Sequence, residues 1–390
     1  MAFDSQAATQ AHLSVLSEAE LQLARDYTLG NHWLILTSLV VSFVVTWLIV
    51  RSGALDWVFR KVSERWPNAR VFVVAAVYSI VSAILTLPYA IYTDWWRETQ
   101  YERTSQPLSD YLGQSITGAA LSTVLGALFF IGLYFLLRRA GKLWWAWAGG
   151  LVAAAISIML LLSPALIEPL FNDFEPVPEG EVRDAILVMA AQAEIPEDRI
   201  FVFDGSRQSN NFTANVSGIG ANARIAISDV ALGEASLDEV KAVTGHEIGH
   251  YVLGHVWRQI IVLSVLAVVV FFLTARTYPF FARVFGSAAP IDDVRGLPVF
   301  LFTVGLFFTL AQPVTNTLTR IGEREADAYS LATVGLPDAL SEALVKTAEY
   351  RYPLAGPVEE AIFYTHPTVR NRVLSAMEWK AANTNPAPAE

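Results

Sequence analysis

The chain of 390 residues lacks cysteine altogether and is poor in charged side chains. The absence of thiols excludes disulfide scaffolds, thiolate metal sites and cysteine nucleophiles. Charged residues make up only 16% of the chain, against roughly 25% in ordinary globular domains, whereas hydrophobic residues make up 54%. The formal net charge is −10. Because nucleic-acid binding requires a basic surface, no nucleic acid is expected as a partner.

Six long apolar stretches account for this composition. They cover approximately residues 32–50, 71–92, 116–137, 144–167, 260–275 and 297–316. A membrane-spanning helix needs about 20 apolar residues, and only the fifth stretch is clearly shorter. Tryptophans such as Trp144 and Trp257 stand at the ends of spans, as expected at a membrane surface. The sequence therefore predicts a polytopic, multi-pass α-helical protein embedded in a lipid bilayer.

The rest of the chain is polar enough to fold outside the lipid. The predicted division is an N-terminal amphipathic segment (1–30), four transmembrane helices (31–167), a first polar region (168–256), two transmembrane helices (257–316), a second polar segment (317–382) and a frayed tail (383–390). Within the polar parts we expect helices at 181–192 and 320–331, short strands at 200–203 and 224–227, and a loop or irregular edge strand between these strands.

The run His246-Glu-Ile-Gly-His250 carries two of the six histidines of the chain. It follows a capping-box pattern, Ser236 with Glu239, that predicts the start of a helix running through His250 and on toward the fifth span. Residues four apart share one face of a helix, so both imidazoles can bind one metal ion. Glu247 can then act as general base toward a water held by that metal, and this HExxH arrangement is typical of zinc.

A catalytic zinc site needs a third protein ligand and an open position. His255 is one candidate, but continuing the helix places it off the face of the two histidines, and we prefer a polar role near the membrane surface. Glu323 and Asp327 are four residues apart and hence share a helix face. Glu323 can complete a His₂Glu set, with Glu325 as the competing ligand, and Asp327 can accept the outer N–H of a ligand histidine.

Together, these motifs resemble the integral-membrane zinc endopeptidases of the CAAX prenyl protease 1 type. That family has HExxH, two membrane spans and then ExxxD, and the same order occurs here in His246–His250 and Glu323–Asp327. The resemblance selects Glu323 rather than Glu325 as the third ligand. It implies one Zn²⁺ per chain and a mostly α catalytic domain with a small sheet, of the thermolysin-like (gluzincin) class.

Four further segments are similar to the same family. They are Leu87–Tyr92, Pro164–Pro176, Asp204–Arg207 and Thr365–Arg372. The last resembles a His-Pro-x-x-x-x-Arg motif, which implies that His366 is catalytic, either holding the substrate or stabilising the oxyanion. Arg372 is then a structural or charge partner in the site.

One segment, Thr213–Gly218, departs from the family pattern Asn-Ala-Tyr-x-x-Gly. Thr213 stands in place of the usual Asn, and Asn215 in place of the usual Tyr. By resemblance, Thr213, Ala214 and Asn215 lie on the strand that pairs with the substrate, and backbone pairing does not depend on the exchanged side chains. The count of four spans before the catalytic region also differs from the five of eukaryotic members.

Charge and resemblance make opposite predictions for the orientation in the membrane. Lysines and arginines gather in residues 51–70, 138–142 and 276–295. The positive-inside rule places these connections in the cytoplasm and the catalytic region outside. The family instead has its zinc site facing the cytoplasm, in a plasma, bacterial inner or endoplasmic reticulum membrane. We follow the family order of spans and expect the catalytic side to be cytoplasmic.

The hypothesis that these residues favour is a zinc-dependent membrane endopeptidase that hydrolyses peptide bonds. Its partners would be peptide or protein substrates, including lipid-modified or membrane-embedded ones. An HtpX-like quality-control protease shares both motifs, but such chains are typically shorter and have fewer spans. The alternative from another class is a non-catalytic zinc-binding or transport protein. The spans contain almost no ionisable residues, which disfavours transport.

Overall fold

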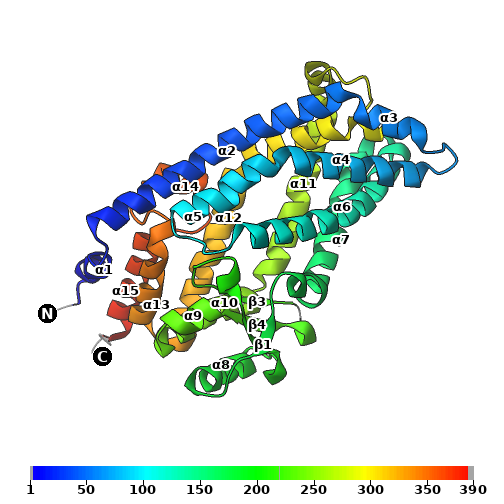
Figure 1. The fold of residues 1–390 in the computed structure, drawn as a ribbon. Coiled ribbons are helices and arrows are strands. Elements are labelled where there is room, and N and C mark those ends of the chain that lie inside the picture. The colour runs from blue at the N-terminus through cyan, green and yellow to red at the C-terminus, as the bar shows by residue number, and fades with distance from the viewer. Residues whose placement is uncertain (1–2, 219, 385–390) are drawn as a thin grey trace.

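The computed structural model describes residues 3–218 and 220–384, and long helices dominate it (Figure 1). Six helical stretches within these residues are long and apolar enough to cross a membrane, which confirms the predicted polytopic class. They are α2 (Glu18–Ser52), α4 (Pro67–Ala90) continued by η1 (Ile91–Trp96) and α5 (Arg97–Gln100), α6 (Leu108–Arg139), α7 (Trp144–Leu162), α11 (His255–Phe285) and α12 (Leu297–Val334). The other α-helices are α1 (Ser5–Leu13), α3 (Ala54–Lys61), α8 (Glu181–Gln192), α9 (Asp229–Glu234), α10 (Leu237–Val252), α13 (Pro337–Lys346), α14 (Pro357–Phe363) and α15 (Val369–Thr384).

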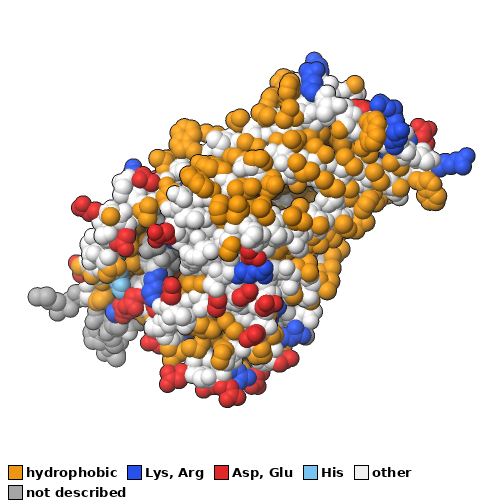
Figure 2. All heavy atoms as spheres, viewed as in Figure 1, with side chains coloured by type: hydrophobic (Ala, Val, Ile, Leu, Met, Phe, Trp, Pro, Cys, Tyr) orange, Lys and Arg blue, Asp and Glu red, His pale blue; other side chains and the backbone are white. Residues whose placement is uncertain are grey.

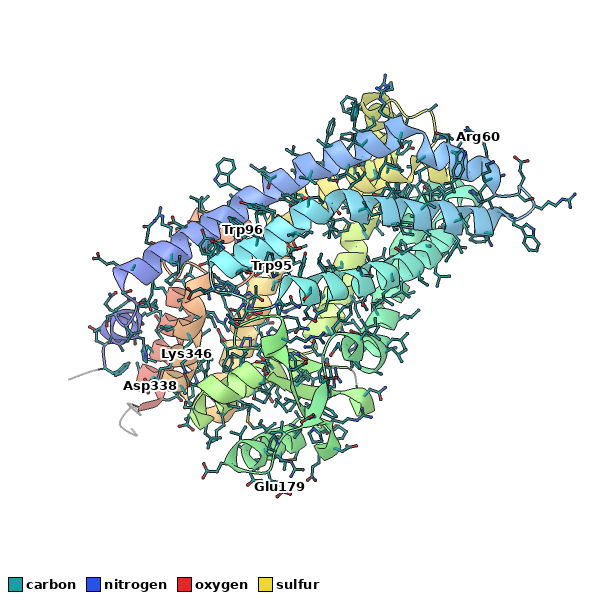
Figure 3. The ribbon with its side chains drawn as sticks, viewed as in Figure 1. Arg60, Trp95, Trp96, Glu179, Asp338 and Lys346 are labelled. Carbon is teal, nitrogen blue, oxygen red and sulfur yellow. The ribbon has the colours of Figure 1, made fainter. Side chains whose placement is uncertain are left out.

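The surface of the long-helix part is apolar between two charged ends. Figure 2 shows hydrophobic side chains over this part, with basic side chains at its far tip and acidic ones over the part that carries the sheet. Arg60 on α3 and Glu179, just before α8, mark the two ends in Figure 3. Inside, fully buried aromatic side chains such as Phe285 and Phe300 fill the space between the helices. An apolar band between polar ends is the arrangement that a bilayer requires.

A small mixed sheet forms part of the polar end, as predicted. Its spatial order is β1 (Phe174–Pro176), β2 (Ile200–Phe203), β4 (Arg224–Ser228) and β3 (Ala214–Ser217). β2 and β4 are parallel, and the two outer pairs are antiparallel. All of β4 is buried, and Ile225 and Ile227 pack against apolar side chains of α8 and α10. Because β3 is last in the strand order, it is an edge strand. It lies within the segment predicted as a loop or irregular edge strand.

The helices α10 and α12 cross at a glycine. A Cβ added at Gly249 would lie 3.2 Å from the Cα of Ala326, so a larger residue would push the two helices apart. Ser236 and Glu239 form the predicted capping box at the start of α10. α12 is one continuous helix, so the helix predicted at 320–331 is the polar end of the sixth span rather than a separate element.

The first and last helices of the described residues pack against the same apolar cluster. Leu13 of α1 shares an apolar cluster with Leu340 of α13 and Met377 of α15. α2 begins at Glu18, so the predicted N-terminal segment comprises α1 and the first turns of the first span. Residues 385–390 of the predicted frayed tail lie outside the part of the chain that the structure describes.

Candidate active site

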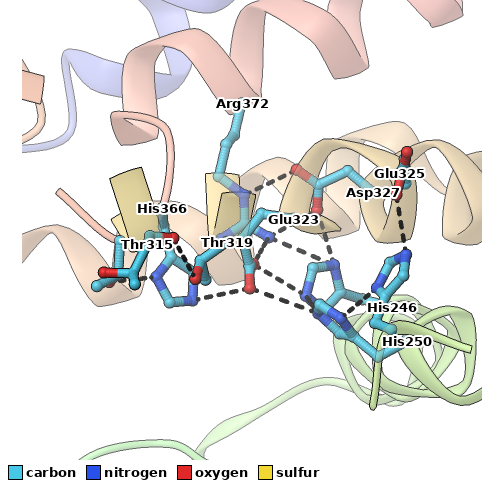
Figure 4. Close-up of polar contacts among 11 residues, drawn as sticks. His246, His250, Thr315, Thr319, Glu323, Glu325, Asp327, His366 and Arg372 are labelled. Carbon is cyan, nitrogen blue, oxygen red and sulfur yellow. Dashed lines mark hydrogen bonds and ion pairs between the residues drawn. The ribbon is translucent and has the colours of Figure 1, made fainter. Parts of the chain in front are cut away.

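Three side chains from the two crossing helices converge (Figure 4). His246 and His250 project from α10 and Glu323 from α12, and one donor atom of each lies within 4.8 Å of the others. The Nε2 atoms of the histidines are 3.1 Å apart. The Glu323 oxygens lie 3.3 Å from Nε2 of His246 and 3.5 Å from Nε2 of His250. The structure thus brings together the three residues predicted as metal ligands.

The chemistry of this donor set fits a divalent metal ion. Glu323 Oε2 is buried and accepts no hydrogen bond from the described residues, although Arg372 Nη2 lies 3.7 Å away. A buried carboxylate oxygen without a hydrogen bond is costly, and a bound metal ion would compensate it. Two imidazole nitrogens and a carboxylate oxygen form a known catalytic zinc set. Nitrogens held about 2.0–2.1 Å from a tetrahedral ion are separated by about 3.3 Å, close to the spacing of the two Nε2 atoms.

Glu325, the competing ligand, lies on another side of α12. Its Oε2 accepts a hydrogen bond from Arg258 Nη1 at 2.7 Å and lies 3.0 Å from His255 Nε2. It is not part of the group of donor atoms around Glu323. The geometry therefore favours Glu323 over Glu325, in agreement with the family resemblance.

Asp327 and Arg372 support His246 from behind. Nδ1 of His246 lies 2.9 Å from Asp327 Oδ1, and Arg372 donates to both oxygens of Asp327 at 2.6 and 2.8 Å. In the neutral imidazole, donation from Nδ1–H to Asp327 leaves Nε2 as the acceptor that faces Glu323. Burial lowers the pKa of His246, but the carboxylates of Asp327 and Glu323 outweigh burial and raise this pKa to about 9. The same negative charge attracts a metal cation.

A cleft of about 180 Å³ opens beside the donor set, and Glu247 lies in its wall. Burial raises the pKa of the Glu247 carboxyl above its ordinary value of 4.5. A raised pKa brings a carboxylate closer to the range in which it both accepts and returns a proton. The lining residues are Phe212, Thr213, Ala214, Val243, His246, Glu247, Glu323, Leu340, Ala343, Leu344, Thr347, Arg351, His366 and Arg372.

His366 enters the same cleft from the segment between α14 and α15. Its Nε2 lies 3.2 Å from Glu323 Oε1, and its Nδ1 lies 2.9 Å from the hydroxyl of Thr365. Burial, together with the positive charge of Arg351, lowers the pKa of His366 to about 3. The imidazole is therefore neutral at physiological pH and offers an uncharged N–H. Arg351 was not anticipated from the sequence, because no motif marks it.

The predicted substrate strand lies at the rim of the cleft. Thr213 and Ala214 line the cleft, whereas Asn215 is not among its lining residues. Ser228 N–H donates to the carbonyl of Thr213 at the start of the β3–β4 pairing. Because hydrogen-bonded pairs alternate along an antiparallel ladder, Ala214 directs its N–H and C=O away from β4.

The structure corrects the expectation of a continuous helix after His250. The helix predicted to continue past His250 instead ends at Val252, and Gly254, at φ +66°, turns the chain before α11 begins at His255. A positive φ of this kind strongly favours glycine. His255 is buried, and its Nδ1 lies 2.8 Å from Nδ1 of His250. It lies outside the donor group, as expected, and at the first residue of the fifth candidate span, but as a buried partner of His250. Gly254 was the sequence signal for the turn.

Comparison with protein families decides the identity of the chain. A family model described as Peptidase family M48 matches residues 176–380, which is more than half of the chain and includes all three donor residues. The chain belongs to peptidase family M48. A second family model, described as CAAX prenyl protease N-terminal, five membrane helices, matches residues 4–173 of this M48 peptidase. Among the described residues, four of the candidate spans lie within that stretch.

Individual relatives extend over nearly the whole M48 peptidase. A protein of Bacillus subtilis named uncharacterized metalloprotease YhfN is 26% identical over 93% of this chain and 87% of its own length. A CAAX prenyl protease 1 homolog of Arabidopsis thaliana is also 26% identical, over 93% of this chain and 88% of its own length. The crystal structure of S. mikatae Ste24p matches with a TM-score of 0.75 and 19% identity, covering 93% of this chain and 89% of that one, which shows a shared fold.

These matches confirm the predicted resemblance and the predicted enzyme class. The protein is a multi-pass membrane metallopeptidase of the M48 family. Neither the HtpX-like alternative nor a non-catalytic binding or transport protein is favoured by the matches.

Proposed function

We propose that this membrane metallopeptidase uses zinc to hydrolyse peptide bonds within peptide or protein substrates. One observation carries the proposal: the donor set of His246, His250 and Glu323 lies beside Glu247 in the wall of a cleft. Residues 168–256 and 317–382 would together form the catalytic part, because they supply α10 and the polar end of α12.

Each residue of the donor set has a defined task in this proposal. His246 and His250 would hold zinc through Nε2 and Glu323 through its carboxylate, while Asp327 and Arg372 orient His246. Bound zinc supplies Lewis acidity, which polarises a substrate carbonyl and lowers the pKa of a water beside it toward about 7.

Two other side chains, Glu247 and His366, transfer the proton and stabilise the developing charge. Glu247 accepts the proton of the attacking water and delivers it to the leaving amine, and its raised pKa assists both transfers near neutral pH. His366, neutral because of its lowered pKa, donates an N–H to the carbonyl oxygen as negative charge develops there.

The substrate is proposed to bind as an added strand along Thr213, Ala214 and Asn215. β3 is the edge of the sheet, and Ala214 directs its backbone groups outward at the rim of the cleft. An extended peptide can pair with such an edge through its main chain. The main chain of the substrate is then held beside Glu247 and the donor set, and this does not depend on the substrate's side chains.

The range of substrates is proposed from the names of the relatives. Because several are named CAAX prenyl protease 1 homologs, we propose that lipid-modified, membrane-bound proteins are among the substrates. The membrane is proposed to be a plasma, bacterial inner or endoplasmic reticulum membrane, with the catalytic part in the cytoplasm. Cleavage of a prenylated and an unprenylated form of one peptide tests whether the lipid is needed.

The central test is zinc content measured together with peptide cleavage in detergent. We compare the wild type, Glu247→Gln and, as a control on an exposed loop, Glu179→Gln. We expect about one zinc ion per chain in all three proteins, with cleavage lost only in Glu247→Gln. A folded wild type without zinc would overturn the proposed metal. A zinc-loaded wild type that cleaves neither form of the peptide would favour a non-catalytic role.

A further inference from the structure

We propose that His255 is a positioning residue that holds His250 in the tautomer and orientation needed to bind the metal, and that Glu325 and Arg258 in turn hold His255. This inference rests on the metal site proposed above, which it extends outward from His250. The three residues belong to neither the donor set nor the cleft.

The two nitrogens of His250 face different partners. Nε2 lies 3.1 Å from Nε2 of His246 and 3.5 Å from Glu323, so it belongs to the donor set. Nδ1, on the other side of the ring, lies 2.8 Å from Nδ1 of His255. A nitrogen that binds a metal carries no proton, so the proton of a neutral His250 resides on Nδ1. Nδ1–H therefore donates to His255, whose Nδ1 acts as the acceptor.

The tautomer of His255 follows from this contact. With Nδ1 as acceptor, the neutral ring carries its proton on Nε2, which lies 3.0 Å from the negatively charged Glu325 Oε2, a charge contact without hydrogen-bond geometry. The same carboxylate oxygen accepts from Arg258 Nη1 at 2.7 Å. His255 is only 8% exposed, so solvent has little access to compete for its nitrogens. If Nε2 of His250 binds the metal, the 2.8 Å contact between the two rings and the negative charge of Glu325 together favour one proton position in each ring.

His246 has a comparable support made of different residues. Its Nδ1 faces Asp327 directly, and Arg372 holds that carboxylate. In the support of His250, the imidazole of His255 lies between the His250 ring and the carboxylate of Glu325. Both supports end in an arginine–carboxylate pair, so each histidine of the donor set is oriented from its outer side. Outer partners of this kind typically contribute 10–100-fold to metal affinity.

The break between α10 and α11 makes the contact possible. In an unbroken helix, five residues rotate a side chain by about 500°, which would leave His255 about 140° around the axis from His250. Gly254, with φ +66°, interrupts the helix and lets α11 begin with the ring of His255 turned back toward His250. The position of His255 is therefore a consequence of this turn.

The test separates the two nitrogens of His255 by substitution. His255→Asn keeps an acceptor near the position of Nδ1, His255→Gln keeps a polar group only near the position of Nε2, and His255→Leu keeps neither. Gln259→Leu is the control, since Gln259 is exposed on the same helix and outside the donor set. The zinc dissociation constant is measured by chelator competition, and the visible spectrum of the cobalt-substituted protein reports the ligand geometry.

We expect zinc binding to weaken by about 10–100-fold in His255→Leu and His255→Gln, with a changed cobalt spectrum. His255→Asn should recover a large part of the affinity, which a purely structural role would not produce. Equal zinc affinity and identical cobalt spectra for folded His255→Leu and Gln259→Leu would overturn the proposal. If the wild type itself binds no zinc, the proposed metal site is wrong. That outcome differs from equal zinc affinity of His255→Leu and Gln259→Leu, which would overturn only the role of His255.

Discussion

His246 and Asp327 are 81 positions apart in the chain, yet Nδ1 of His246 lies 2.9 Å from a carboxylate oxygen of Asp327. The contact joins α10 to α12, and Arg372 of α15 completes it by donating to Asp327 at 2.6 Å. Three segments of the chain are thus coupled through one buried carboxylate. The orientation of His246 depends on all of them.

The first prediction concerns this carboxylate. Asp327→Asn preserves the size of the side chain but removes the charge that stabilises the His246 Nδ1–H tautomer and pairs with Arg372. We expect zinc affinity to fall about 10–100-fold in chelator competition. Asp338→Asn is the matched control, because Asp338 pairs with Lys380 away from the donor set. Equal affinities for the two variants would contradict the role of Asp327.

The second prediction concerns His366. If its N–H stabilises charge on the carbonyl oxygen, His366→Ala should lower kcat about 10²–10³-fold. The Michaelis constant and the zinc content should change little, because the interaction strengthens only in the transition state. Steady-state cleavage of a fluorogenic peptide gives both constants. A large rise of KM with unchanged kcat would instead indicate that His366 only holds the substrate.

The third prediction tests strand addition at β3. Ala214→Pro removes an N–H that faces away from β4, whereas Asn215→Pro removes one from the ladder with β4. We expect Ala214→Pro to impair peptide binding while the protein stays folded, and Asn215→Pro to lower the thermal stability. KM and the unfolding temperature are measured for both. If Ala214→Pro cleaves peptides normally, the substrate does not pair with this edge.

The fourth prediction concerns the start of α10. Lys346 Nζ lies 2.7 Å from Glu239, which also closes the capping box with Ser236. Burial alone would raise the pKa of Glu239, but Lys346 and Ser236 outweigh burial and lower it. A lowered pKa means that the ionised carboxylate stabilises the fold above the unfolded-state pKa, and that this stabilisation disappears as the pH falls through the folded-state value.

Glu239→Gln should therefore cost about 1–2 kcal/mol of unfolding free energy at pH 7. The difference from the wild type should shrink as the pH falls below the ordinary glutamate value of about 4.5. Thermal unfolding in detergent at several pH values measures it. A difference that is constant with pH would exclude the charge of Glu239 as its cause.

The fifth prediction concerns membrane orientation, which the absence of cysteine makes simple to measure. Glu64 and Glu179 are exposed at opposite ends of the protein, so Glu64→Cys and Glu179→Cys each introduce a single thiol. With the catalytic part in the cytoplasm, a membrane-impermeant maleimide applied to intact cells should label only Glu64→Cys. Labelling of only Glu179→Cys would instead support the orientation predicted by the positive-inside rule.

Part of this architecture could be read from local patterns. The helix at 181–192 and the strand at 200–203 were predicted with the bounds that the structure shows. The fifth span is longer than the predicted 260–275, because the helix continues through charged residues at both ends, among them Arg258 and Arg276. Hydropathy detects where a chain can lie in lipid, but it does not detect where a helix ends.

Local sequence patterns predict features that depend on residues close together in the chain: the spans, the capping box of α10, and the shared helix face of His246 and His250. Other features depend on how the helices pack against one another. The choice between Glu323 and Glu325 depends on how α12 is rotated against α10 where Gly249 meets Ala326. The contact of His255 with His250 depends on the turn at Gly254. Helical periodicity fixes directions only within one helix, and these contacts join two.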